Sequence, residues 1–270
     1  FMAVLMSHSV GSAAAISNYV SDCRKKRVAV YPPSINKSDD RFVVRDGGIY
    51  YSLLGIQNVG AITVRNLLAE REKNGPFRSY HDFVSRTATI INRRVAEYLV
   101  WSGALDDFSL PRKHMAENYE SALDFVKYKP LFAEEELISQ EHDGEEYSFE
   151  ELSALEREAL GLNLKYSVFA RYAAIVSRYR LPDLAALPVA GDVKAVFAIQ
   201  GIKQIITKNN TEMAFLQIYD DSGKMDAVLF PDTYRRYKRV LTEGEIYLGR
   251  GKTEIRNNRI QFIINNMEEN

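Results

Sequence analysis

The spacing of hydrophobic residues changes about two thirds of the way along the chain. Before residue 190, apolar side chains recur every three or four positions, which is the period of one helix face. Ala61, Val64, Leu67 and Leu68 form one such face. The period predicts helices over residues 12–30, 60–72, 79–86, 111–127 and 149–180, and one more from an N-cap at Asn92 to a stop at Gly103.

Beyond residue 191 the hydrophobic period becomes two, as in strands with one buried face. The predicted strands are 193–206, 212–219, 224–230, 245–255 and 259–266, with a helix near 232–240. Five strands with a helix between the third and the fourth is the order of an OB barrel. A short hairpin is also predicted within 41–51, turning at Asp46-Gly47-Gly48. The predicted fold class is α+β and multidomain, with a mainly helical N-terminal half and a C-terminal five-stranded OB barrel.

The composition of the 270 residues is that of a folded protein, with 46% hydrophobic and 26% charged residues. Cys23 is the single cysteine, which excludes an intrachain disulfide and a cysteine-based zinc site. No run approaches the roughly 18 apolar residues that a membrane-spanning helix needs. The apolar start at residues 1–6 is short and lacks a basic leader, so we expect no signal peptide. We expect a cytoplasmic protein whose first residue lies within a domain.

Charge is distributed in blocks along the chain. Residues 1–113 carry a net charge of +6, residues 114–190 carry −8, and residues 191–270 carry +1. The basic N-terminal part is suited to a polyanion, and the acidic middle is not. Little apolar periodicity is present between about 133 and 150, which predicts an exposed linker.

A candidate phosphate-binding turn lies at Asn58-Val59-Gly60, at the end of the motif Leu53-Leu54-Gly55-Ile56-Gln57-Asn58-Val59-Gly60. In this motif a short apolar helix is expected to meet a tight turn and then the helix that starts near Ala61. The pattern resembles a helix-hairpin-helix, whose turn usually reads Gly-apolar-Gly. Asn tolerates left-handed backbone best among non-glycine residues. Free N–H groups at the following helix N-terminus would contact a phosphate, with Arg65, Arg71 and Lys73 adding charge. The alternative is a plain tight turn between packed helices.

A second hairpin is a weaker possibility at residues 87–92, followed by Arg93 and Arg94. It has no glycine, and a capped helix with two solvated arginines is the alternative. Two hairpins at this spacing would together hold a duplex.

The segment Tyr128-Lys129-Pro130-Leu131-Phe132 follows a predicted helix and precedes the acidic linker. Leu131 and Phe132 would prefer a core, so an exposed pair on a tether could fill an apolar pocket of a partner. The alternative is that both side chains fold back onto their own domain.

The predicted barrel could bind a single strand through aromatic and basic side chains. The candidates are Lys203, Lys208, Phe215, Gln217, Tyr219, Arg250 and Lys252. Because the net charge of this part is only +1, the alternative is a barrel that packs against a neighbour.

Catalytic patterns are absent from the sequence. The four histidines are far apart, and no nucleotide-binding loop or triad context occurs. The pairs Asp39-Asp40 and Asp220-Asp221 are interpreted as turn residues. We expect no catalytic residue, no metal site and no cofactor in this chain.

In their order, these features resemble the C-terminal part of a bacterial replicative DNA polymerase III alpha subunit of the C family. The residues that carry the resemblance lie at 1–5, 32–38, 54–60, 92–95, 102–106, 156–162 and 220–230. The resemblance implies four parts: the end of the fingers domain at 1–50, a helix-hairpin-helix region at 51–127, a clamp-binding peptide with acidic linker and connecting helices at 128–190, and an OB domain at 191–270.

The resemblance implies a nucleotidyltransferase whose metal-binding aspartates lie in a palm domain upstream of Phe1. The implied partners are duplex and single-stranded DNA, the sliding clamp and other replisome subunits, with no membrane. The family's clamp-binding peptide, typically Gln-x-x-Leu/Met-Phe, would fall on Tyr128, Leu131 and Phe132, where the glutamine is absent. The alternative function is a stand-alone OB module that binds nucleic acid or protein.

Overall fold

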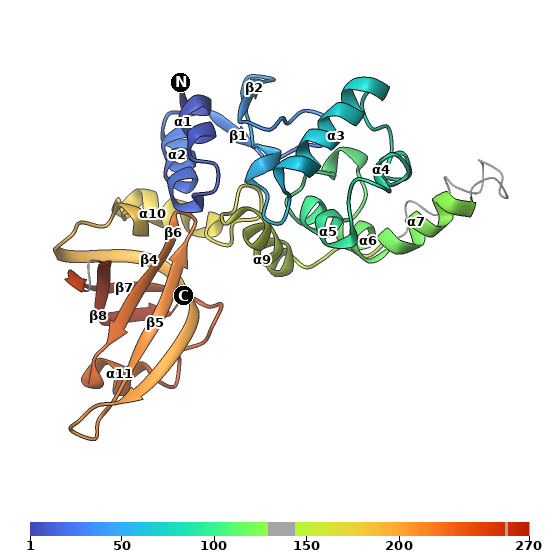
Figure 1. Ribbon diagram of the computed structural model, residues 1–270. Helices are drawn as coiled ribbons and strands as arrows, with labels where there is room; N and C mark the ends of the chain where they lie inside the picture. Colours follow the sequence, from blue (N-terminus) through green and yellow to red (C-terminus); the bar gives the residue numbers. More distant parts are fainter. Residues whose placement is uncertain (129–143, 257–258, 270) are drawn as a thin grey trace. The chain divides into compact units, whose positions relative to one another are not determined.

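The computed structural model describes residues 1–128, 144–256 and 259–269 (Figure 1). The chain divides into two compact units, Phe1–Val168 and Phe169–Asn270. Each unit has its own hydrophobic core. The helical and the barrel parts are therefore described separately below.

The first unit begins with two helices and a small sheet. The helices are α1 (Met2–His8) and α2 (Ala13–Lys25), and the strands are β1 (Ala29–Tyr31), β2 (Val43–Arg45) and β3 (Gly48–Tyr50). The predicted hairpin is confirmed, because β2 pairs antiparallel with β3; β1 adds in parallel on the other side of β3. The helix predicted to reach residue 30 ends at Lys25, since Arg27 has a left-handed φ of 57° and a strand follows.

Helices make up the rest of this unit. They are η1 (Leu53–Gly55), α3 (Ala61–Asn74), α4 (Tyr80–Thr87), α5 (Arg93–Trp101), η2 (Asp106–Phe108), α6 (Arg112–Glu117), α7 (Tyr119–Tyr128) and α9 (Phe149–Leu160). The Asn92 side chain accepts the Val95 N–H at 3.0 Å, which confirms the predicted N-cap. Gly103 has a φ of 87° just past α5, as a glycine after a helix should.

Two predicted helices are shorter than the hydrophobic pattern indicates. The segment 111–127 is broken at Asn118, whose side chain bonds the His114 carbonyl at 2.9 Å. The helix predicted over 149–180 ends at Gly161, which has a φ of 77°. In both cases a local hydrogen bond or a left-handed residue overrides the apolar period.

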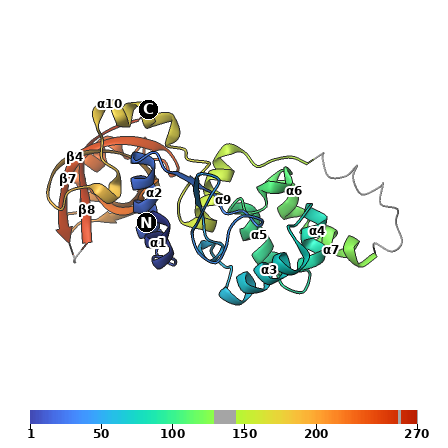
Figure 2. The same ribbon diagram turned by 90° about the horizontal axis from the view of Figure 1, so that it is seen from above.

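The core of the first unit joins the sheet to the helices. Tyr51, Leu53, Phe83, Leu99 and Leu105 are each fully buried. Burying an aliphatic or aromatic side chain of this size contributes about 1.5–3 kcal/mol. Figures 1 and 2 both show α4 beside α7, and this pair closes one side of the unit.

A buried ion pair fixes α6 to the turn after α5. Arg112 is 2% exposed, and its Nε and Nη2 each contact a carboxylate oxygen of Asp106 at 2.8 Å. The remaining Nη1 donates to the Trp101 carbonyl, and the guanidinium lies 5.0 Å from the Tyr166 ring centroid. Gly103 must lack a side chain, because a Cβ there would come within 2.3 Å of Arg112.

The second unit begins with η4 (Ala170–Tyr172), α10 (Ala173–Tyr179) and η5 (Leu184–Ala186). A closed barrel follows, made of β4 (Gly191–Ile206), β5 (Glu212–Asp220), β6 (Gly223–Leu229), β7 (Ile246–Arg256) and β8 (Arg259–Glu269), with α11 (Pro231–Tyr237) between β6 and β7. The order is β4-β5-β6-β8-β7, with β6 and β8 parallel and the other neighbours antiparallel. The predicted barrel is confirmed.

Large inward side chains fill the barrel, with Phe197, Tyr247 and Phe262 at its centre. The leucines of the η5 region, Leu184 and Leu187, belong to the same core. Asp220 accepts the N–H of Leu184 at 2.7 Å and the N–H of Ser222 at 2.7 Å. Burial raises the pKa of Asp220 to about 6, against the opposing effect of these hydrogen bonds. This carboxylate therefore ties η5 to the β5–β6 turn.

In the described residues we find no helix long and apolar enough to cross a bilayer.

The Asp106–Arg112 pair predicts a defined acid sensitivity. Burial acts to raise the pKa of Asp106, but Arg112 and Lys165 outweigh it and hold that pKa below its usual range. The stabilisation is therefore complete above the unfolded pKa of about 4 and is lost as the pH falls through the folded pKa. Asp106→Asn should lower the free energy of unfolding at neutral pH by about 3 kcal/mol. Denaturant titrations across the acid range measure both effects.

The exposed Glu117 offers a matched control, since Glu117→Gln removes a solvated carboxylate from the neighbouring helix. An Asp106→Asn variant as stable as this control would show that the pair contributes nothing to stability.

Candidate nucleic-acid interface

The first hairpin turn lies where it was predicted, between η1 and α3. Asn58 has a left-handed φ of 61°, the conformation for which asparagine was proposed. The side chain of Val59 is 5% exposed and belongs to the core, so it anchors the turn from beneath. The Gln57 N–H donates to the Ala159 carbonyl of α9 at 2.8 Å. The helix expected before the turn is a single 3-10 turn at Leu53–Gly55.

The N-terminus of α3 is open to solvent. Gly60 is its N-cap, and within the part of the chain that the structure describes no side-chain cap hydrogen bond is made at this end. Apart from Gly60 and its two chain neighbours, no atom of the described residues lies within 4 Å of the point where a Gly60 Cβ would be, and Ala61 is exposed. No acidic residue occupies this first turn. Uncapped N–H groups and the helix dipole give such an end a partial positive charge that attracts a phosphate.

The positive charge beside this turn comes from fewer residues than predicted. Arg65 is exposed. Arg71 is only 14% exposed and does not face solvent: its Nη2 contacts Asp39 at 2.6 Å. Its Nη1 donates to the carbonyls of Ile35 and Ser38 at 2.9 and 2.7 Å. The prediction that Arg71 contributes to phosphate binding is therefore wrong, because its guanidinium holds the 35–39 loop against α3.

Ile62 was not singled out from the sequence. Its side chain is 71% exposed in the first turn of α3. The available signal was its position outside the apolar face formed by Ala61, Val64, Leu67 and Leu68. An exposed apolar side chain at the edge of an anion site can contact the sugars beside a bound phosphate.

The second hairpin joins α4 to α5. The Thr87 carbonyl accepts the N–H groups of Ile90 and Ile91 at 2.8 and 3.0 Å, and this closes a tight turn before Asn92. Arg93 pairs with Glu97 at 2.9 Å, whereas the side chain of Arg94 is exposed. The turn is therefore a capped helix start with two exposed arginines, one of which is partly neutralised.

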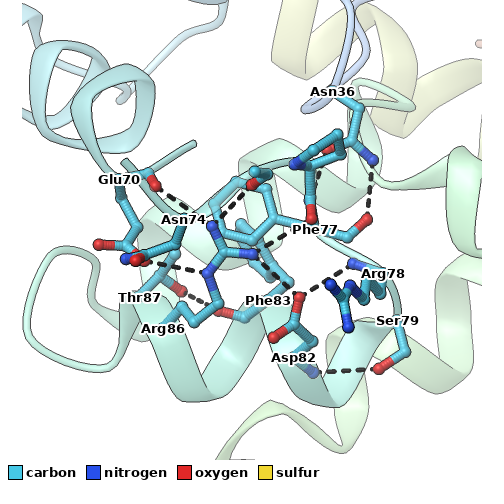
Figure 3. A network of polar contacts seen from close by, with 12 residues as sticks. Asn36, Glu70, Asn74, Phe77, Arg78, Ser79, Asp82, Phe83, Arg86 and Thr87 are labelled. Atoms are coloured by element: carbon cyan, nitrogen blue, oxygen red, sulfur yellow. Dashed lines mark hydrogen bonds and ion pairs between the residues drawn. The ribbon is translucent and has the colours of Figure 1, made fainter. Parts of the chain in front are cut away.

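Arg86 fixes the segment between the two hairpins (Figure 3). Its guanidinium contacts Glu70 at 2.9 Å and Asp82 at 3.1 Å, and it donates to the carbonyls of Gly75 and Pro76. It also lies 4.3 Å from the Phe77 ring centroid. The end of α3 and the start of α4 are thus held together by one side chain.

The candidate clamp peptide begins at the end of α7. Tyr128 is the last residue of this helix. Leu131 and Phe132 lie outside the described residues. Their binding role stays a prediction.

On the barrel, two of the candidate residues are direct neighbours. Lys203 of β4 pairs with Phe215 of β5, and both point outward. The same row continues through Val228 and Ile263 to Lys252 of β7. Val228 is 1% exposed, so the row is not open along its whole length.

A second basic group lies on β7 and β4. Arg250 is directly opposite Lys194, and both side chains are exposed. Like charges facing each other across strands repel, so an anion placed between them would relieve the repulsion. Lys194 was missed from the sequence because the pairing of β4 with β7 joins residues that are far apart along the chain.

The other barrel candidates have different surroundings. Lys208 is exposed in the β4–β5 turn, which is closed by the Thr207 N–H donating to the Thr211 carbonyl at 2.8 Å. Tyr219 lies edge-on to Phe169, 5.9 Å between ring centroids, so part of its ring is used within the protein. Gln217 is exposed on β5.

The described residues contain no group of three or more His, Cys, Asp or Glu side chains that could hold a metal ion. Asp39 pairs with Arg45 and Arg71, and Asp220 accepts N–H groups of its own turn. Both carboxylates therefore have structural partners, as their interpretation as turn residues implies.

Each of the two units contains a segment that matches a known protein family. Residues 27–115 match the helix-hairpin-helix motif, and residues 189–269 match an OB-fold nucleic acid binding domain. The fold and the site thus define a chain with a helix-hairpin-helix region followed by an OB-fold domain.

Whole-chain relatives are DNA polymerase III alpha subunits. The subunit of Bacillus subtilis strain 168 is 32% identical over 285 residues, which covers 99% of this chain and 25% of the relative. That of Borreliella burgdorferi is 31% identical over 284 residues, covering 98% of this chain and 25% of the relative. That of Staphylococcus epidermidis RP62A is 29% identical over 276 residues.

The chain is therefore homologous to DNA polymerase III alpha subunits over its whole length, and it spans about a quarter of the length of these relatives. This confirms the resemblance drawn from the sequence. The order of a helix-hairpin-helix region and an OB domain is consistent with a C-terminal segment of such a subunit.

Gly60→Val should weaken duplex DNA binding without unfolding the protein. The backbone at Gly60 has an ordinary φ of −77° and open space around the Cβ position, so the fold tolerates a side chain. A bulky group there blocks the approach of a phosphate to the α3 N-terminus. We expect at least a severalfold loss of affinity, and a salt slope smaller by about 1 for the lost contact. Fluorescence anisotropy with a labelled duplex measures both.

Gly201→Val is the matched control, because Gly201 also has open space and lies in β4 of the other unit. Equal affinities for the two folded variants would refute phosphate binding at this hairpin.

Proposed function

We propose that the chain is a non-catalytic segment of a replicative DNA polymerase. It holds duplex DNA through its hairpins, docks a sliding clamp through residues 128–132, and places its OB barrel on single-stranded template. The observation that carries the proposal is the open, uncapped N-terminus of α3 at Gly60, inside a chain homologous to DNA polymerase III alpha subunits.

Duplex binding through the hairpins is independent of base sequence. The donors are backbone N–H groups after Asn58-Val59-Gly60, with Arg65, Arg93 and Arg94 as flanking charges. Such groups contact phosphates and read no base edges. Affinity is therefore modest, with dissociation constants on the order of 10⁻⁴ to 10⁻⁶ M that weaken with salt. Weak, non-specific holding suits a protein that moves along DNA.

Single-strand contact is assigned to the barrel. Support comes from the exposed Lys203 beside Phe215, from Arg250 with Lys252, and from Lys208 in the β4–β5 turn. Basic side chains track a phosphate backbone, and an aromatic ring stacks on bases. Lys203 and Phe215 lie on β4 and β5, whereas Arg250 and Lys252 lie on β7. Each pair can therefore contact a different part of one DNA strand.

Polymerisation itself is assigned to the part of the protein that this chain does not contain. Nucleotidyl transfer by two metal ions needs clustered carboxylates. Asp39 and Asp106 are instead paired with arginines, and Asp220 accepts hydrogen bonds from turn amides. Other replisome subunits would bind the complete protein.

If residues 128–132 dock the clamp, a mutation there should abolish clamp binding without changing DNA binding. Replacing Leu131 and Phe132 together by alanine should abolish capture by a purified bacterial sliding clamp, because a pocket that buries both recovers about 1.5–3 kcal/mol per side chain. Duplex affinity should not change, since the hairpin residues are untouched. Tyr128→Gln should strengthen capture by adding a polar anchor. Clamp pull-down and duplex anisotropy on the same preparations measure this.

Phe149→Ala is a control that removes a half-exposed aromatic ring elsewhere. If the double alanine variant kept clamp binding and lost thermal stability instead, Leu131 and Phe132 would be core residues and the docking role would be wrong.

A further inference from the structure

One end of the barrel carries a polar pocket that none of the predicted site residues line. Its volume is about 210 Å³, and it lies between the β4–β5 turn and α11. The lining residues are Asn210, Thr211, Glu212, Pro231, Tyr234 and Arg235. A space of this volume corresponds to about seven liquid waters, enough for one planar base.

The segment beside this pocket, made of α11 and the two residues after it, carries much of the positive charge of the barrel unit. Residues 231–239 contain four cations, Arg235, Arg236, Lys238 and Arg239, against the single carboxylate of Asp232. A second basic stretch, residues 250–259, carries four cations against one carboxylate. The rest of residues 191–270 is acidic, with four cations against nine carboxylates. The small net charge therefore conceals a strongly basic segment at residues 231–239.

Three of the four cations in residues 231–239 are available to a ligand. Lys238 is not available, because its Nζ forms an ion pair with the Glu212 carboxylate at 3.0 Å. Arg235 contacts Asp232 at 3.5 Å, but both side chains are more than 70% exposed, so water screens the pair. Arg236 and Arg239 are exposed, and in the described part of the chain neither makes an ion pair.

The helix is held firmly enough to present these groups. Tyr234 is 6% exposed and packs into the barrel core. The Tyr237 hydroxyl donates to the Asn266 side chain of β8. At the start of the helix, Phe230 leaves 45% of its surface exposed. An exposed aromatic ring next to arginines is the pairing that single-strand binding surfaces use.

The polar groups that line the pocket suit the hydrogen-bonding edge of a nucleic-acid base better than they suit an apolar ligand. Asn210 offers an amide and Arg235 a guanidinium, whereas the Glu212 carboxylate is balanced by Lys238. The Thr211 hydroxyl is shared with Thr207 at 2.6 Å. The pocket therefore presents both donors and acceptors without a net negative charge.

We propose that α11 and the residues just after it bind single-stranded DNA: phosphodiesters lie on Arg235, Arg236 and Arg239, and one base enters the pocket beside Asn210. Guanidinium groups pair with phosphate oxygens in a bidentate geometry. The exposed Phe230 ring at the start of α11 can also stack on a base, which favours a nucleic acid over an acidic protein surface. The proposal rests on the single-strand role given to the barrel, and it extends that role to a helix outside the strands.

The test is binding of a labelled oligothymidylate to the full chain over a range of salt concentrations. Replacing Arg235, Arg236 and Arg239 together by alanine should lower affinity at least tenfold and reduce the salt slope by about 2, since each phosphate contact on a single strand contributes about 0.7. The matched control is Arg171→Ala, Arg178→Ala and Arg180→Gly, which removes three exposed cations near α10. Glycine is used at Arg180 because its φ is 50°. Thermal unfolding verifies each fold.

A second variant tests the pocket. Asn210 has a left-handed φ of 56°, so Asn210→Gly keeps the turn and removes only the amide. It should lower affinity severalfold and leave the salt slope unchanged, because the amide contacts a base. Unchanged affinity would overturn the placement of a base in the pocket.

An α11 variant that binds as tightly as the native chain, or a control that loses as much, would overturn the proposal; the first result would leave an acidic protein surface as the partner of α11. If the native chain itself failed to bind the oligonucleotide, the single-strand role of the whole barrel would be wrong.

Discussion

The hairpin surface depends on the guanidinium of Arg86. It contacts Glu70 near the end of α3 and Asp82 in α4, and it satisfies carbonyls of the loop between them (Figure 3). A guanidinium offers five donors in a fixed plane, so one side chain can fix two helices and a loop at once. Phosphate binding by backbone amides needs this rigidity, because backbone donors cannot adjust to a ligand as long side chains do.

Those parts of the structure that obey local rules were predictable from the sequence. The Asn92 cap, the stop at Gly103 and the left-handed Asn58 each depend on the residue itself and its nearest neighbours. The barrel strands were predictable because every strand has one face in the core and a period of two. Helix length was less predictable, since the break at Asn118 comes from a side-chain bond to His114 that leaves the apolar period intact.

Contacts between distant residues were not predictable. Arg71 lies near the predicted phosphate site in sequence, yet Asp39, 32 residues earlier, takes its charge. Lys194 and Arg250 become neighbours only through the pairing of β4 with β7. The basic character of α11 was visible in the sequence, but the pocket beside it depends on how the β4–β5 turn folds back. Electrostatic roles in this protein are thus decided by tertiary structure.

The attachment of η5 to the barrel has a consequence for how this domain is delimited. Leu184 and Leu187 complete the barrel core, and the Leu184 N–H bonds the Asp220 carboxylate. A protein cut at residue 189, where similarity to OB-fold domains begins, loses both leucines and this donor. The barrel would then expose an apolar opening, and the half-buried carboxylate would have one hydrogen bond fewer. The smallest autonomous folding unit of the C-terminal half therefore extends upstream of the homologous domain, into the segment that connects it to the helices.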